Sequence, residues 1–166
     1  MKFLIYAAGQ NRRFNNTLKG EPKGLQLVAG KPLIEFGLSW MVKYYPTEII
    51  IVVGYKSDLF KKTLGTSFSG IPIKYVFNNK YDLHGNMSSL WVVREHCNDD
   101  IIFTVSDLLC DKENIDFFMK SDLPSKILID KSKNLFSDPD PVKVSISQKG
   151  IYRILKKIPE NEIDGI

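Results

Sequence analysis

Residues 2–25, KFLIYAAGQNRRFNNTLKGEPKGL, place an apolar run before a turn of small residues and then a long polar and basic stretch. Phe3–Tyr6 is typical of a buried β-strand, and Ala7, Ala8 and Gly9 follow it directly. Small residues after a strand let the backbone approach another group closely, and free N–H groups in such a turn can point at an anion. The segment therefore predicts a strand whose carboxyl end meets a negatively charged molecule.

Six further segments have the composition of β-strands. Glu48–Val53 and Ile101–Val105 are continuous apolar runs, which indicates strands covered on both faces. The other four are Ile73–Phe77, Lys126–Asp130, Val142–Ser147 and Ile151–Leu155.

Helical patterns lie between the strands. Pro32 suits a first helical position, and Ser57 and Asn86 are candidate caps of two later helices. Trp40 and Trp91 are expected in the core. Apolar residues follow Pro32 at a spacing of three or four: Leu33, Phe36, Trp40 and Tyr44.

This alternation of strands and helices predicts an α/β sandwich with a mainly parallel central sheet. After about residue 125 the pattern changes to strands joined by short polar connections, which predicts an antiparallel edge toward the C-terminus. At 166 residues, the whole of 1–166 is expected to form a single domain.

Composition excludes several classes of protein. The net charge of +4 comes from 23 basic and 19 acidic residues; it suits an anionic small molecule, and no run of like charges marks a nucleic-acid tail. Cys97 and Cys110 lack metal-site or disulfide spacing. The apolar start ends at Gln10 without a cleavage site, and the longest aliphatic run, Ile49–Val53, cannot span a bilayer. We therefore expect a cytoplasmic protein that binds neither nucleic acid nor membrane.

Two common phosphate-binding motifs are absent from the sequence. No Gly-x4-Gly-Lys-Ser/Thr string occurs. A dinucleotide fingerprint would need glycines where Asn11 and Phe14 stand, and an acidic residue closing the second strand, where Gly54 stands. The turn after the first strand is therefore neither a Walker A loop nor a dinucleotide-binding motif.

Charged residues follow two of the predicted strands. Arg13 can grip phosphate oxygens with two donors, while Lys23 acts as a point charge. Asp107 comes just past an apolar strand, where a carboxylate suits Mg²⁺; Asp111 is its nearest competitor. Ligands of open α/β sheets bind at the carboxyl ends of strands. A phosphate and magnesium site is thus predicted. The alternatives are that Arg13 and Lys23 are ordinary surface cations and that Asp107 is a turn or helix-cap residue.

The stretch AAGQNRRF…PKGL resembles the signature of nucleotidyltransferases that activate sugar phosphates and related small molecules, the MobA-like NTP transferases. Their pattern is a strand, Leu-Ala-Ala-Gly-x-Gly-x-Arg, a variable loop and Pro-Lys; LVAGKPLIEF, residues 27–36, also matches. Asn11 replaces the second glycine, and Ser106 replaces a glycine that precedes the metal-binding aspartate. The matching residues are Ala7, Ala8, Gly9, Arg13, Pro22 and Lys23.

This resemblance implies a Rossmann-like three-layer α/β/α fold. Arg13 and Lys23 would be catalytic, and Asp107 would hold Mg²⁺. Residues of the turn would bind the nucleotide, namely Ala7, Ala8 and Gly9.

Residues 77–95, FNNKYDLHGNMSSLWVVRE, are similar to a segment of the branch that includes choline-phosphate cytidylyltransferases of bacterial surface-glycan pathways. The similarity implies that Asn78, Asn86 and Ser89 bind the nucleotide, although a helix cap and a first-turn serine are local alternatives. Later stretches, DPDPVKVSI and RILKKIPENEIDGI, imply acceptor contacts. Their candidate residues are Lys143, Lys156 and Glu162.

The implied activity is Mg²⁺-dependent transfer of CMP from CTP to a small phosphorylated acceptor such as phosphocholine, with release of pyrophosphate, for capsule or lipopolysaccharide decoration. Two alternatives remain open: a sugar-1-phosphate or guanylyl nucleotidyltransferase, and a catalytically incomplete nucleotide-binding module. The family continues to a second metal-binding aspartate without a counterpart here, so we expect a C-terminally truncated chain whose uncovered edges would favour a homodimer. His84 and His96 are expected to have no direct role.

Overall fold

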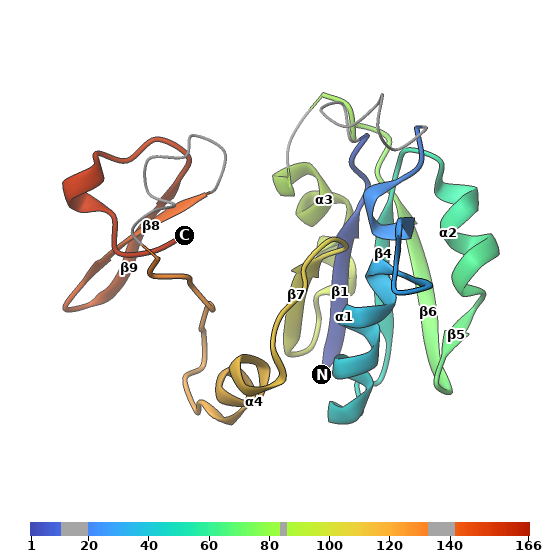
Figure 1. The fold of residues 1–166 in the computed structure, drawn as a ribbon, viewed down its shortest axis with the longest axis horizontal. Helices are drawn as coiled ribbons and strands as arrows, with labels where there is room; N and C mark the ends of the chain where they lie inside the picture. Colours follow the sequence, from blue (N-terminus) through green and yellow to red (C-terminus); the bar gives the residue numbers. More distant parts are fainter. Residues whose placement is uncertain (11–19, 84–85, 133–141) are drawn as a thin grey trace. The chain divides into compact units, whose positions relative to one another are not determined.

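The first strand of the chain is an internal strand of a five-stranded sheet. In the computed structural model, β1 (Lys2–Ala7) is flanked by β4 (Ile49–Val53) on one side and β7 (Ile101–Val105) on the other (Figure 1). β6 (Ile71–Phe77) continues the sheet beyond β4, and these four strands are parallel. The short β5 (Ser67–Phe68) pairs antiparallel with β6 at that edge.

The structure describes part of the chain: residues 1–10, 20–83, 86–132 and 142–166. These residues fall into two units, Met1–Ile115 and Asp116–Ile166, and each is described by itself. Within the described ranges, no helix has both the length and the apolar character needed to cross a membrane.

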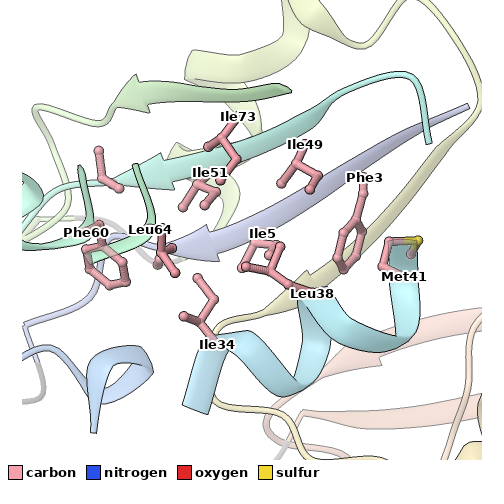
Figure 2. Close-up of a cluster of buried hydrophobic side chains, with 12 residues drawn as sticks. Phe3, Ile5, Ile34, Leu38, Met41, Ile49, Ile51, Phe60, Leu64 and Ile73 are labelled. Carbon is pink, nitrogen blue, oxygen red and sulfur yellow. The ribbon is translucent and has the colours of Figure 1, made fainter. Parts of the chain in front are cut away.

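One face of the sheet is covered by two helices, α1 (Leu33–Met41) and α2 (Ser57–Leu64). Side chains alternate along β1, so Phe3 and Ile5 point to this face. Figure 2 shows the apolar side chains of α1 directed at these strand residues. The helices supply five fully or nearly buried residues: Ile34, Leu38, Met41, Phe60 and Leu64.

The opposite face of the sheet forms a second core. Leu4 and Tyr6 of β1 point to it, and α3 (Asn86–Val93) contributes the fully buried Val93. Helices thus cover both faces, which explains the continuous buried runs Phe3–Ala7 in β1 and Ile49–Val53 in β4. The predicted three-layer α/β/α sandwich with a mainly parallel sheet is confirmed.

The second unit contains an antiparallel hairpin of β8 (Lys143–Ser147) and β9 (Gly150–Leu155). The prediction of antiparallel strands toward the C-terminus is confirmed, and this hairpin is a two-stranded sheet of its own. Gly165 pairs with Val144 of β8, and Ile166 exchanges two backbone hydrogen bonds with Asp130.

Three local predictions were wrong. Lys126–Asp130 is not a strand. Pro32 stands before the first helical residue of α1, where it belongs to a short strand. Ser57 lies inside α2 and does not cap it, because Lys56, with a left-handed backbone at φ 50°, takes the cap position.

The helix α4 (Lys112–Lys120) includes the boundary between the two units. The remaining described elements are short: η2 (Lys23–Leu25), β2 (Leu27–Val28), β3 (Lys31–Pro32), η3 (Val42–Tyr44), η4 (Arg94–His96) and η6 (Glu160–Glu162).

Candidate active site at the carboxyl end of the sheet

The order of the strands marks the carboxyl ends of β1 and β7 as a candidate site. The chain leaves β1 toward β4 and β6, then returns to the other side of β1 to form β7. Connections after β1 and β7 therefore diverge at the carboxyl end of the sheet, which is where open α/β sheets bind ligands. Gly9 follows β1 and is exposed, whereas Ala7 and Ala8 before it are buried. Ser106 and Asp107 follow β7 at the same edge.

An ion pair lies at this edge. Lys23 Nζ donates to Asp107 Oδ2 at 2.7 Å, and the two side chains are 41% and 28% exposed. The structure thus brings together two residues that are distant in the sequence, a cation suited to phosphate and a carboxylate suited to a metal ion.

The turns after β1 and β4 are joined at the same end of the sheet. Tyr55 N–H donates to the carbonyl oxygen of Ala8 at 3.1 Å. Gly54 has no room for a side chain, because a Cβ there would lie 2.6 Å from Tyr81 and 2.8 Å from Ala8 O. In the sequence, Gly54 was notable only because a dinucleotide-binding motif would need an acidic residue there. In the structure, it is a site of close packing.

Replacing Gly54 by alanine should lower the free energy of unfolding by about 1–3 kcal/mol, the usual cost of overpacking. The neighbouring carbonyl is backbone and cannot swing aside as a flexible side chain would. Urea denaturation measures the change. Gly37→Ala is the matched control, since a Cβ at Gly37 in α1 meets nothing within 4 Å and should be neutral or slightly stabilising. Equal effects of both substitutions would contradict the packing argument.

Asn78 ties the end of β6 to the first turns of α3. It is 1% exposed, and its Nδ2 donates to Ser88 Oγ at 2.9 Å and to Ser89 Oγ at 3.2 Å. Its Oδ1 accepts the Lys80 N–H at 2.9 Å. Asn86 begins the helix and is exposed. Both amide hydrogens of Asn78 are thus engaged within the chain, and one of them binds Ser88, which the sequence analysis did not single out.

A pocket of about 640 Å³ opens beside α3. Neither Lys23 nor Asp107 lines it. Trp91 does, and its side chain is 67% exposed, so the prediction that it belongs to the core was wrong; the Arg94 guanidinium lies 4.3 Å from the centre of its ring. The lining residues are Asn78, Asn79, Lys80, Met87, Ser88, Trp91, Val92 and Arg94.

The side chains of Tyr6 and Cys110, both in the first unit, are neutral near pH 7 because burial raises the pKa of each. Burial, aided by the nearby Cys97 thiol group, raises the pKa of Tyr6 to about 12. Burial, aided by the Asp111 carboxylate, also raises the pKa of the Cys110 thiol. Neither is therefore suited to act as a base or a nucleophile near neutral pH. Both cysteines are free.

The second unit contains the three residues predicted to contact an acceptor. Lys143 is only 4% exposed, and its Nζ donates to the Lys156 carbonyl oxygen at 3.4 Å. The Glu162 carbonyl oxygen accepts from the buried Ser145 hydroxyl at 2.7 Å, and the Glu162 carboxylate pairs with Arg153. Within this unit, then, all three residues take part in contacts that hold the hairpin to the segment after it.

Two predicted positions lie outside the described residues. These are Arg13, the predicted partner of Lys23, and His84. His96 lies in η4, where its Nδ1 is 3.3 Å from Lys74 Nζ.

Comparison with known proteins decides the family. Residues 3–131 match the MobA-like NTP transferase domain, which covers most of the chain. The chain belongs to this family. Both the central sheet and the Lys23–Asp107 pair fall within the matched residues of this MobA-like domain.

Two curated relatives differ in the nucleotide that their names specify. The choline-phosphate cytidylyltransferase of Streptococcus pneumoniae is 32% identical over 112 residues, which is 66% of this chain and 46% of that protein. The UTP–glucose-1-phosphate uridylyltransferase AglF of Haloferax volcanii is 26% identical over 64% of this chain and 43% of its own length. This MobA-like chain thus spans less than half the length of either relative.

The fold comparison covers nearly the whole chain. The inositol-1-phosphate CTP transferase of T. maritima aligns with a TM-score of 0.76 at 20% identity, over 98% of this chain and 66% of that one. At this identity the likeness concerns the fold alone, and it agrees with a MobA-like α/β/α sandwich.

Proposed function

We propose that this chain provides the nucleotide site of a nucleotidyltransferase that transfers CMP from CTP to a small phosphorylated acceptor and releases pyrophosphate. The observation that carries the proposal is the Lys23–Asp107 pair at the carboxyl ends of β1 and β7. Membership of the MobA-like family supports the reaction type, and the pneumococcal relative supports the cytidylyl group.

In this reaction an ionised oxygen of the acceptor phosphate attacks the α-phosphorus of CTP. The bond from that phosphorus to the bridging oxygen of pyrophosphate breaks, and its electrons leave with pyrophosphate, so no enzyme base is needed. Lys23 would stabilise the charge that develops on this leaving group. Gly9, exposed at the end of β1, would let the nucleotide phosphates approach the backbone.

The donors near Asp107 fit a magnesium ion only together with the substrate. Among the described residues no three His, Cys, Asp or Glu side chains cluster as a metal site. Mg²⁺ usually takes one or two carboxylates and completes its shell with phosphates and water. Asp107 would be the carboxylate in that arrangement, and the ion, when bound, would neutralise negative charge on the nucleotide phosphates.

The predicted nucleotide contacts at α3 are part of the same proposal. Asn86 is exposed at the start of the helix, where its amide group could reach a base or a phosphate. Asn78 and Ser89 are buried and bonded to each other, so we propose that they hold this end of α3 in place. The surface-polysaccharide role rests on the sequence resemblance alone.

A second candidate, uridylyl transfer to a sugar 1-phosphate, is favoured by the similarity to the Haloferax enzyme. A nucleotide-binding module without transfer is a third candidate.

Measuring pyrophosphate release with each of the four NTPs separates these candidates. We expect release with CTP in the presence of phosphocholine, and none when the acceptor is omitted. Release with UTP and glucose 1-phosphate instead would support the second candidate. Nucleotide binding by calorimetry without release for any pair of substrates would support the third, and no binding of any NTP would contradict all of them.

A further inference from the structure

Gly24, the residue after Lys23, packs directly against the residue before Asp107. A Cβ at Gly24 would lie 2.7 Å from Ser106 Cβ and 2.8 Å from Ser106 Oγ. Carbon atoms of this kind essentially never approach other heavy atoms within 3.0 Å. The backbone of η2 can therefore lie on Ser106 only because residue 24 has no side chain.

Neither partner of this contact can easily move. Ser106 is 9% exposed, and its N–H donates to the Tyr6 carbonyl oxygen at 3.0 Å, which fixes it to β1. The η2 turn is closed by a hydrogen bond from Leu25 N–H to the Pro22 carbonyl oxygen at 3.0 Å. The nearest atom of Ser106 is its Cβ, which moves only with the backbone. A side chain at Gly24 would therefore push η2 away as a unit.

That displacement would act on the ion pair. Lys23 belongs to η2, and Asp107 directly follows Ser106. The contact between Gly24 and Ser106 therefore sets how far apart Lys23 and Asp107 lie. The Ser106 side chain occupies the space beside β7 that a side chain at Gly24 would need.

We propose that Gly24 and Ser106 are a size-matched positioning pair that sets the distance between Lys23 Nζ and Asp107 Oδ2. The catalytic part of this inference rests on the proposed function, whereas its geometric part does not. The contact depends on the summed size of the two residues. Gly24→Ala should therefore be tolerated when it is combined with Ser106→Gly.

The test is a substitution cycle of Gly24→Ala, Ser106→Gly and the double variant, with Gly37→Ala as the control glycine. We expect Gly24→Ala to lower kcat for nucleotidyl transfer by about 10-fold to 10²-fold, the range for misplacement by a fraction of an ångström to one ångström. Ser106→Gly should stay within a few-fold of wild type. The kcat of the double variant should be well above that of Gly24→Ala. It should stay somewhat below that of wild type, because the carbonyl oxygen of residue 106, 3.2 Å from the added Cβ, remains.

Crystal structures of the same variants give a readout that needs no activity. The distance from Lys23 Nζ to Asp107 Oδ2, 2.7 Å in the wild-type chain, should exceed hydrogen-bonding range in Gly24→Ala and return in the double variant. An intact ion pair in Gly24→Ala, or a double variant no better than Gly24→Ala, would overturn the inference. If the wild-type chain binds no nucleotide, the proposed function fails, and these distances still decide the inference about the pair.

Discussion

Lys23→Ala is expected to lower the turnover of nucleotidyl transfer by about 10²-fold or more, the usual cost of removing one preorganised charge contact from a transition state. Lys23 is held 2.7 Å from Asp107 at the carboxyl end of the sheet, so its ammonium group is already at the edge where phosphates are expected. The effect should fall mainly on kcat, because charge on pyrophosphate grows as the bond to the α-phosphorus breaks. Steady-state kinetics with CTP and phosphocholine measure it.

The fold of this variant should remain close to that of wild type. An ion pair as exposed as this one contributes about 0–1 kcal/mol to stability, so a large loss of activity could not be attributed to unfolding. Lys31→Ala, an exposed lysine in the short β3 strand, is the matched control and should turn over normally. Calorimetric binding of pyrophosphate extends the test to a chain without transfer activity. Unchanged kinetics and unchanged pyrophosphate affinity would remove Lys23 from the proposed site.

Asp107→Asn should abolish the dependence of CTP binding on magnesium. Asparagine keeps the size of the side chain and an oxygen that can accept the Lys23 hydrogen bond, but it lacks the charge that a hard divalent cation requires. CTP affinity without metal should not fall, and it could rise, because Lys23 no longer shares its charge with a carboxylate. Titrations with CTP alone and with Mg·CTP give the two affinities.

The control for this substitution is Asp111→Asn. Asp111 was the nearest rival in the sequence, and it is exposed just before α4. Its loss should leave both affinities unchanged. Equal enhancement of CTP binding by Mg²⁺ in wild type and Asp107→Asn would show instead that Asp107 is a structural partner of Lys23 and not a metal ligand.

The sequence predicted well where one strong physical effect decides the structure. Ile49–Val53 is the apolar part of a predicted strand and is buried at every residue, because helices cover both faces of the sheet there. Ile101–Val105 matches the bounds of β7, but the prediction that it is covered on both faces was wrong, since Phe103 of this edge strand is 61% exposed. Lys23 and Asp107 were predicted to lie near one another, since parallel strands share a carboxyl edge.

What the sequence could not predict depends on contacts between distant segments. Nothing local distinguishes Gly24 from an ordinary loop glycine; only the position of Ser106 in space makes it necessary. Asn78 resembled a ligand-binding amide, and its burial against Ser88 and Ser89 follows from the path of the chain after β6. Trp91 has the spacing of a core residue, but it lies on the side of α3 that is turned to solvent.

The position of β1 between β4 and β7 also bears on how the chain folds during synthesis. β1 is translated before the other strands of its sheet, yet its partner β7 begins only at Ile101, where Lys2 pairs. One edge of a strand that is apolar from Phe3 to Ala7 therefore has no β7 to pair with until most of the sheet has been translated. Pairings of such long sequence separation form slowly, and exposed apolar edges aggregate. Nascent chains that pause before β7 should therefore depend on chaperones, and ribosome-bound chains that include β7 should resist proteolysis far better than those that end before it.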